Sequence, residues 1–564
     1  MSESAIQIRI GGEAGQGLET VGQLLARGLV RCGYEILVSQ NYMSRIRGGH
    51  NFFSVVVDKE PVHSPASGVD LLLAMNGETV TRHREDLREG GRILADASQV
   101  EKDAEDVVAV PFSELVREKL YTNTAALGSA VALLGLDPEV FEGLLREVLG
   151  GKSQEAAEKN ADAFAKGRSW IRENSRPLQG LPSPASQQGD RLALNGNQAI
   201  ALGAMAAGAN FCSFYPMTPS TGVALNLAAQ AEELGIVAEQ AEDEIAAVNM
   251  AIGASFSGAR TIVPTSGGGF SLMAEGISLA GMTETPLVIV LAQRPGPATG
   301  LPTRTEQGDL QIALYSGHGE FPRAVFTPGT PEECFHLTCR ALDLAERSQS
   351  LAVVITDQYL ADSIRAVAPF SLHDLPETAK PGTETADPGA YVRYDFHPSG
   401  VSQRLLPGTG THLVVADSDE HTPDGHITED LSVRTRMVDK RLAKRRVLVE
   451  NAVPPEADGP EDPELLFITW GSSKGAVLRA ASDLRQQGRS VGTLHFRQVC
   501  PLLPEQFLHR LKSAGNTVCV EGNATGQLAR LIRQETGFAA DHLIHRYDGL
   551  PMDAETIHAQ LQGI

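Results

Sequence analysis

The chain has 564 residues, which is too many for a single hydrophobic core, so we expect several domains. Its 70 acidic residues outnumber its 48 basic residues, and the net charge of −22 argues against nucleic acid or an anionic membrane as a partner. The six cysteines form no C-x-x-C pair, and neither a signal peptide nor an apolar run of roughly 20 residues is evident, so a cytoplasmic protein with free thiols is expected.

The first expected domain spans residues 1–180. A short alternating strand at 6–10 is followed by the turn GGEAGQG and then by a helical stretch, which is how a doubly wound α/β unit begins. The turn could hold an anion on backbone N–H groups, but its spacing is not G-x-G-x-x-G, so a purely structural turn is an equal alternative. Farther along, Arg45, Arg47 and His50 precede a strand and are explained by a basic surface turn. The alternative is that Arg45 or Arg47 contacts a second carboxylate of a substrate, a role that Arg304 could also fill.

The rest of the chain divides into two further α/β blocks. A linker at 181–190 leads to a block at 191–368, a connector rich in Pro, Asp, Thr and Gly fills 369–463, and a third block fills 464–564. The connector carries one charged helix, LSVRTRMVDKRLAKRR. The predicted fold class is therefore α/β, with three doubly wound parallel-sheet domains. Strands of the middle block are expected at 210–214, 236–238, 261–264, 286–292, 324–326 and 352–355.

Three strands of the middle block end in unusual loops, at residues 215–221, 265–269 and 294–303. Ligands of open parallel sheets bind outside the carboxyl ends of the strands. Because the carboxyl ends of parallel strands share one edge of the sheet, we expect these three loops to converge there.

The first of these loops, Tyr-Pro-Met-Thr-Pro-Ser-Thr, combines rigidity with hydroxyl groups. Pro216 and Pro219 restrict the backbone on either side of Thr218, whose hydroxyl is thereby held in a defined place. Ser220 or Thr221 is expected to cap the helix that follows.

The third loop begins with Arg294, a forked cation suited to a carboxylate, and Thr303 adds a further hydroxyl. Each of these residues alone is explained by a rigid turn or a capped helix. Together with Thr218 they predict a pocket for a carboxylate.

A helix is expected within residues 241–259. Ile245 and Val248 belong to its apolar stripe, whereas Glu244 and Ala247 lie on a neighbouring face of small residues that would allow a close approach to the carboxyl group. The alternative is that Glu244 only complements the dipole of the first helical turn.

Several of these motifs resemble the 2-oxoacid:ferredoxin oxidoreductase family. The segments YPMTPSTG, E-x-x-A-x-x-x-A-x-G-A from Glu244, and RPGPATGLPTRTEQGD carry the likeness in the middle block. GGEAGQG and SRIRGGHN resemble the family's gamma domain, and TWGSSKG and VEGNATGQL resemble its closing domain. The chain is thus similar to an alpha subunit with the gamma domain fused ahead, most of all to members that act on 2-oxoglutarate, with pyruvate or a broad range of 2-oxoacids as the alternative.

The resemblance implies a gamma domain, a thiamine-diphosphate pyrimidine-binding domain and a transketolase C-terminal-like domain. It places Glu244 where the family's glutamate faces N1′ of the aminopyrimidine, with Tyr215 and Pro216 also at the cofactor. It places Thr218, Arg294 and Thr303 around the 2-oxoacid, and it makes Glu244, Thr218 and Arg294 the catalytic residues. Two positions depart from the family's pattern: methionine at 217 replaces isoleucine and alanine at 298 replaces serine.

The family's metal-binding G-D-G…N run is missing, because Gly308-Asp309 is followed by Leu310, and no cysteine set for a cluster is present. We therefore expect no metal ligands in this chain. The resemblance assigns Mg²⁺, the diphosphate cradle and a 4Fe–4S cluster to a beta subunit, coenzyme A to the role of cosubstrate, and ferredoxin to that of electron acceptor, in an (αβ)2 assembly. The alternative from another class is a non-catalytic nucleotide-binding protein.

Overall fold

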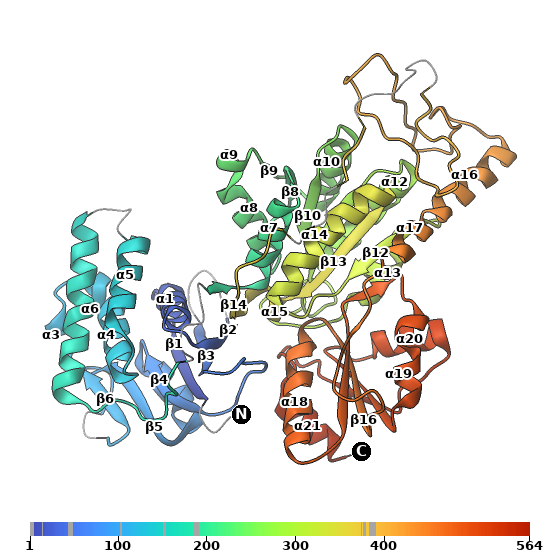
Figure 1. Ribbon diagram of the computed structural model, residues 1–564. Coiled ribbons are helices and arrows are strands. Elements are labelled where there is room, and N and C mark those ends of the chain that lie inside the picture. The colour runs from blue at the N-terminus through green and yellow to red at the C-terminus, as the bar shows by residue number, and fades with distance from the viewer. Residues whose placement is uncertain are drawn as a thin grey trace. The chain divides into compact units, whose positions relative to one another are not determined.

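The computed structural model describes residues 5–13, 15–42, 49–101, 104–149, 154–184, 191–373, 375, 379–382 and 391–563. Arg45 and Arg47 lie outside these residues. The chain forms two compact units, one of residues 1–195 and 362–369, the other of residues 196–361 and 370–564 (Figure 1). Within the described part, no helix has the length and apolar character needed to cross a bilayer.

The first unit is built on an eight-stranded sheet with the order β6-β5-β4-β1-β3-β2-β14-β7. The half from β6 to β1 is parallel, and the half from β3 to β7 is antiparallel. Its strands are β1 (Ile6–Glu13), β2 (Glu35–Asn41), β3 (His50–Asp58), β4 (Val69–Ala74), β5 (Leu87–Asp96), β6 (Val107–Val110), β7 (Leu192–Leu194) and β14 (Ile364–Val367). Its helices are α1 (Leu18–Arg31), α2 (Gly77–His83), α3 (Phe112–Leu115), α4 (Thr122–Leu133), α5 (Pro138–Leu149) and α6 (Gln154–Asn174).

Two strands of this sheet come from the ends of the block expected at 191–368. Strand β14 pairs with β2 on one side and with β7 on the other, both antiparallel. The chain therefore leaves the first sheet after β7 and returns to it at β14. The structure differs here from the expected domain bounds, because both added strands are too short to carry a recognisable period. The first sheet is also not all parallel, since β3 pairs antiparallel with both β1 and β2.

The second unit contains a seven-stranded sheet with the order β18-β12-β13-β11-β10-β8-β9, parallel except for β18. The six expected strands are all present close to their expected bounds. The strands are β8 (Phe211–Phe214), β9 (Val237–Gln240), β10 (Thr261–Thr265), β11 (Leu287–Gln293), β12 (Arg323–Phe326), β13 (Leu351–Asp357) and β18 (Gln498–Cys500). The helices are α7 (Gly196–Ala206), α8 (Thr221–Ala229), α9 (Ala231–Leu234), α10 (Glu244–Phe256), α11 (Gly267–Leu272), α12 (Ala274–Met282), α13 (Leu310–Tyr315), α14 (Pro331–Ser348) and α15 (Gln358–Asp362).

Helices cover both faces of this sheet. Val263 and Ile289 point to the face that is covered by α10 and α12. Ile262 and Val288 point to the opposite face, which is covered by α7 and α14 (Figure 1). Strand β11 is consequently buried along its whole length, which explains its continuous apolar run.

A five-stranded sheet completes the second unit, in the order β15-β17-β16-β19-β20, parallel except for β15. Its core is continuous with that of the seven-stranded sheet. The strands are β15 (Glu456–Asp458), β16 (Leu465–Trp470), β17 (Val491–Phe496), β19 (Asn516–Glu521) and β20 (His542–His545), and the helices are α18 (Lys474–Gln486), α19 (Leu508–Ser513), α20 (Gln527–Thr536) and α21 (Ala554–Leu561). The α/β class with three sheets is thus confirmed.

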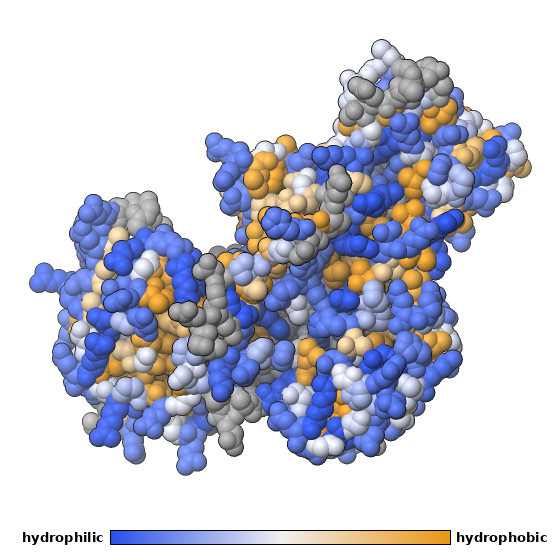
Figure 2. Space-filling model, viewed as in Figure 1, coloured by the Kyte–Doolittle hydropathy of each residue, from blue (hydrophilic) through white to orange (hydrophobic). Residues whose placement is uncertain are grey.

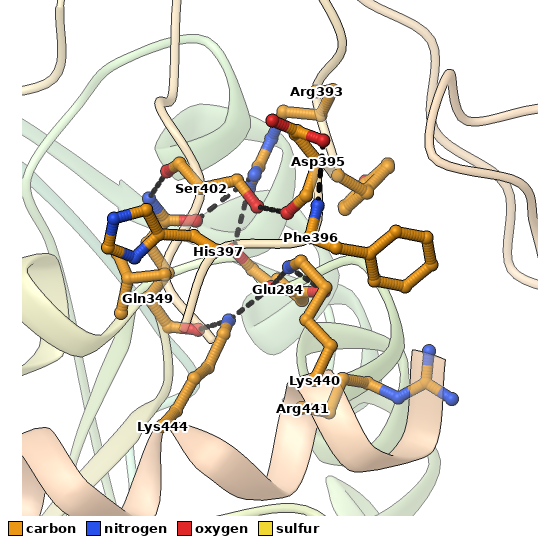
Figure 3. Close-up of polar contacts among 12 residues, drawn as sticks. Glu284, Gln349, Arg393, Asp395, Phe396, His397, Ser402, Lys440, Arg441 and Lys444 are labelled. Atoms are coloured by element: carbon orange, nitrogen blue, oxygen red, sulfur yellow. Dashed lines mark hydrogen bonds and ion pairs between the residues drawn. The ribbon is translucent and has the colours of Figure 1, made fainter. Parts of the chain in front are cut away.

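The connector is held to the seven-stranded sheet's layer by a buried ion cluster of Glu284, Arg393, Lys440 and Lys444 (Figure 3). Nζ of Lys440 and Nζ of Lys444 lie 2.6 Å and 2.5 Å from the same oxygen of Glu284, Oε2. Arg393 donates to the backbone carbonyl of Glu284 at 2.9 Å. The charged helix expected in the connector is split into α16 (Leu431–Ala443) and α17 (Arg445–Glu450).

Candidate active site

The carboxyl ends of β8, β9, β10 and β11 lie along one edge of the seven-stranded sheet, because these neighbouring strands are parallel. The loops that begin at Tyr215, Ser266 and Arg294 follow three of these ends, and the fourth leads into α10. The expected convergence of the loops on one edge is therefore present.

Glu244 is the first residue of α10, and its carboxyl group is buried. The helix start is capped by the preceding residue, Asp243, whose side chain accepts a hydrogen bond from the amide of Ala246 at 2.7 Å. Glu244 is only 3% exposed, and its Oε1 has no hydrogen-bond partner among the described residues. A buried carboxyl oxygen without a partner is costly, so this atom indicates a group that binds from outside the chain.

Glycines at the start of α11 allow this carboxyl group its close approach. A Cβ atom on Gly269 would lie 2.7 Å from Oε1 of Glu244 and would overlap the hydroxyl of Thr265. A Cβ atom on Gly267 would overlap the carboxylate of Asp309. We call residues Gly267–Gly269 the glycine triplet; it is flanked by one carboxyl group on each side.

Arg294 and Thr218 are brought together at this edge. The guanidinium donates to the backbone carbonyl of Thr218 at 2.9 Å and lies 3.4 Å from the sulfur of Met217. Burial lowers the pKa of Arg294, and the carboxylate of Asp309 partly offsets that effect. Met217, which departs from the family's pattern, thus contacts the predicted substrate arginine.

The other predicted residues are less enclosed. Tyr215 and Pro216 are exposed at the start of the first loop, and Thr303 is half-buried in the third. The expected cap of α8 is wrong for Ser220, whose hydroxyl donates to the carbonyl of Met217 at 2.8 Å instead of to the helix. The apolar stripe expected on α10 is wrong for Ile245, whose side chain is 50% exposed.

Asp309 belongs to the same edge, although the sequence indicates it only as part of an incomplete metal motif, Gly308-Asp309. Burial raises the pKa of Asp309 to about 6; Glu306 adds to that rise and Arg294 counteracts it. Its Oδ2 is buried without a partner among the described residues. No local pattern signals this position, because Gly267 is some forty residues away and is brought alongside only by the fold.

The third loop is fixed by the five-stranded sheet. The side-chain amide of Gln307 donates to the carbonyl of Trp470 at 2.9 Å. Its side-chain oxygen accepts from the hydroxyl of Ser473 at 2.9 Å and from the amide of Gly522 at 2.7 Å. The loop that carries Arg294 and Asp309 is therefore held from outside its own sheet.

In the first unit, His50 is buried rather than part of a surface turn. Its Nε2 lies 2.7 Å from Nε2 of His83, and burial together with His83 lowers the pKa of His50 to about 4. Among the described residues, no three or more His, Cys, Asp or Glu side chains are grouped so that they could hold a metal ion.

A carboxyl group that is buried, unsatisfied and faced by glycine is suited to hold a nitrogen heterocycle, and a fixed arginine on the same sheet edge is suited to an acid substrate. The aminopyrimidine of thiamine diphosphate fits the first requirement. The fold and the site together have the features expected of a coenzyme-dependent α/β enzyme.

Comparison with known proteins identifies which enzyme family this is. Residues 202–440 match the family model described as pyruvate flavodoxin/ferredoxin oxidoreductase, thiamine diphosphate-binding, and residues 7–170 match pyruvate ferredoxin/flavodoxin oxidoreductase. The 2-oxoacid:ferredoxin oxidoreductase subunit alpha of Sulfolobus sp is 31% identical, with 96% of this chain and 94% of the relative covered. The chain therefore belongs to the 2-oxoacid:ferredoxin oxidoreductase family, as a thiamine-diphosphate-dependent alpha subunit with a gamma domain fused ahead.

Two further relatives have narrower names. The 2-oxoglutarate oxidoreductase subunit KorA of Mycobacterium tuberculosis is 29% identical, with 94% of this chain and 87% of the relative covered. The solved structure of 2-oxoglutarate:ferredoxin oxidoreductase from Magnetococcus marinus, with 2-oxoglutarate, coenzyme A and succinyl-CoA bound, is 28% identical and has a TM-score of 0.90 over 99% of both chains.

Proposed function

We propose that the chain is the alpha subunit of a 2-oxoglutarate:ferredoxin oxidoreductase. The reaction converts 2-oxoglutarate and coenzyme A to succinyl-CoA and carbon dioxide, passes two electrons to ferredoxin, and is reversible. The substrate is supported by the likeness to the Magnetococcus marinus structure over nearly the whole chain. The alternative, a pyruvate or broad 2-oxoacid enzyme, is kept because the Sulfolobus relative has the broader name.

The observation that carries the catalytic proposal is the unsatisfied Oε1 of Glu244 beside the glycine triplet. Glu244 holds the pyrimidine ring through a hydrogen bond at Oε1. Ala247 and Ala251, both fully buried on the same helix, keep this side of the carboxyl group dry. When bound, thiamine diphosphate supplies the electron sink for decarboxylation.

Arg294 binds the carboxylate of the 2-oxoacid. Its contacts with the carbonyl of Thr218 and the sulfur of Met217 hold the guanidinium plane in place, so a bound carboxylate meets a preorganised fork. The hydroxyls of Thr218 and Thr303 complete the substrate site, and Tyr215 and Pro216 form a rigid wall on the cofactor side.

A second polypeptide, the beta subunit, completes the enzyme and brings Mg²⁺, the diphosphate cradle and the 4Fe–4S cluster; the assembly is (αβ)2 and works in the cytoplasm with ferredoxin. Exposed apolar side chains on α8, β9 and α10 support this partner, namely Leu225, Val237 and Ile245. Figure 2 shows hydrophobic residues on the visible surface over α8 and α9.

The catalytic role is tested with Glu244→Gln in the complex co-purified with its second chain. We expect assembly to persist and 2-oxoacid-dependent dye reduction in the presence of thiamine diphosphate to be lost. The control is Glu242→Gln, which changes an exposed carboxyl group two residues away. Turnover retained in Glu244→Gln would refute the role.

The substrate is tested by comparing kcat/KM for 2-oxoglutarate and pyruvate on the same complex, with thiamine, magnesium and iron assayed. A higher kcat/KM for 2-oxoglutarate is expected. An equal or higher value for pyruvate selects the broad 2-oxoacid alternative.

A further inference from the structure

Three buried polar atoms around the glycine triplet have no partner among the described residues: Oε1 of Glu244, Oγ of Ser266 and Oδ2 of Asp309. They come from separate elements, the start of α10, the end of β10 and the start of α13. Glu244 has a role in the proposed function. Asp309 has none, although it lies at the opposite end of the loop that begins with the substrate arginine, and its charge raises the pKa of that arginine.

The backbone of Asp309 is fixed on both sides. Its amide donates to Oε1 of Gln293 at 2.8 Å, and its carbonyl accepts from the amide of Ala313 at 3.1 Å. Gln293 is itself anchored, because its side-chain amide donates to the carbonyl of Thr356 at 3.1 Å. Arg294 follows Gln293 directly, so the arginine and the carboxyl group share one anchoring residue.

The side chain of Asp309 lies against the glycine triplet. Its carboxylate is packed so closely against Gly267 that a Cβ atom there would overlap it. Two charged groups act on it: Glu306, on the same loop, disfavours its ionised form, and Arg294 favours it. The interaction is mutual, because Asp309 also stabilises the charged form of Arg294 against burial.

We propose that Asp309 is a positioning residue that sets how strongly Arg294 binds the substrate carboxylate, and that it takes up a proton when the 2-oxoacid binds. The inference rests on the proposed role of Arg294. A substrate carboxylate on the guanidinium brings a second negative charge to a poorly solvated place that already holds Asp309. Two carboxylates in one such place do not both stay ionised, so binding favours the protonated form of Asp309.

The direction of the pH dependence follows from this coupling. The pKa of Asp309 is raised to about 6, so the group is ionised at neutral pH and opposes the substrate there. As the pH falls through about 6, Asp309 is neutralised and leaves the whole charge of Arg294 to the substrate. Affinity for the 2-oxoacid therefore increases as the pH falls through this range, and by linkage binding raises the affinity of Asp309 for a proton.

The test is Asp309→Asn in the co-purified complex, assayed with whichever of 2-oxoglutarate and pyruvate the complex turns over faster. We expect KM at pH 7.5 to fall by about three- to tenfold, as a coupling of up to about one pKa unit implies, with kcat unchanged. At pH 5 the variant and the unchanged complex should have the same KM. A KM that rises at pH 7.5, or a pH profile of kcat/KM that keeps its inflection near pH 6, would overturn the inference.

A second variant keeps the inference testable if Asp309→Asn does not fold. Glu306 is half-buried and raises the pKa of Asp309, so Glu306→Gln should move the inflection to lower pH. An inflection that stays in place in Glu306→Gln contradicts the coupling.

Proton uptake gives a readout that does not depend on turnover. The complex with Glu244→Gln is titrated calorimetrically with 2-oxoglutarate at pH 6.5 in two buffers of different ionisation enthalpy. We expect net proton uptake, and we expect it to disappear when Asp309→Asn is added to the same complex. Equal uptake in both complexes contradicts the inference.

Arg294→Ala separates this inference from the proposed function on which it rests. A large rise in KM is expected. If KM does not change, the carboxylate-binding role of Arg294 fails; if KM rises but Asp309→Asn behaves like the unchanged complex, only the inference about Asp309 fails.

Discussion

Adjacent glycines at the start of α11 have opposite surroundings. A Cβ atom on Gly269 would lie 2.7 Å from Oε1 of Glu244, whereas a Cβ atom on Gly268 would have nothing within 4 Å. Gly269→Ala should therefore displace the Glu244 carboxyl group and lower kcat by roughly 100-fold, the usual cost of misplacing a catalytic group by about 1 Å. Gly268→Ala is the matched control and should keep near-normal turnover in the dye-reduction assay. Equal activities would show that the close packing at Gly269 is unimportant.

At the residue scale, sequence reasoning predicted side chains that follow strand ends and missed those placed by tertiary contacts. The loops that carry Arg294 and Thr218 were expected on one edge because parallel strands end there, and the Arg294 guanidinium does contact the backbone carbonyl of Thr218. The role of the Thr218 hydroxyl stays a prediction. The cap expected from Ser220 was wrong because its hydroxyl is used within its own turn. Asp309 could not be found, because its significance depends on burial and on a distant glycine.

The loop from Arg294 to Asp309 depends on Gln307, which binds three backbone or hydroxyl groups of the five-stranded sheet. Gln307→Met keeps the volume but leaves these buried groups unpaired, so we expect a loss of about 2–4 kcal/mol in stability. KM for the 2-oxoacid should rise as well, because the loop carries Arg294. Thermal unfolding and KM are measured beside Gln311→Met, which changes an exposed glutamine at the start of α13. A normal KM in Gln307→Met would mean that the loop holds its shape unaided.

The buried ion cluster makes the stability of the connector depend on pH. Burial lowers the pKa of Lys444 to about 7 from its ordinary 10.5, so between these values the unfolded chain binds a proton that the folded chain does not. Stability should therefore rise with pH across this window, and Lys444→Met should reduce that rise. The unfolding temperature is compared at pH 7 and pH 9, with Arg446→Met, on the exposed side of α17, as the control. An unchanged rise in Lys444→Met would contradict the prediction.

At the element scale, the seven-stranded sheet was predicted well because its strands are buried apolar runs bounded by turn residues. The first sheet was predicted less well. Its two outermost antiparallel strands, β7 and β14, are three and four residues long and meet only after the chain has passed through the second unit. Pairings of this range leave no local trace in the sequence.

At the scale of the whole molecule, the exposed apolar side chains on α8, β9 and α10 predict where the second chain binds. Ile245→Asp should prevent co-purification of the beta subunit, because it buries a charge in the interface, while the unfolding temperature of the isolated chain stays the same. Leu431→Asp, at an exposed leucine at the start of α16, is the control and should leave co-purification intact. Assembly that survives Ile245→Asp would place the partner elsewhere.

The return of the chain to the first sheet has a consequence during synthesis. On the ribosome, β2 emerges early, but β14, the strand that covers its open side, appears only after the whole of residues 196–361 has been made. Until Ile364 and Arg365 are available, one side of β2 presents bare amide and carbonyl groups, which are a template for pairing with other nascent chains. Products that terminate prematurely within the second unit should therefore aggregate through β2, even when their earlier residues have folded.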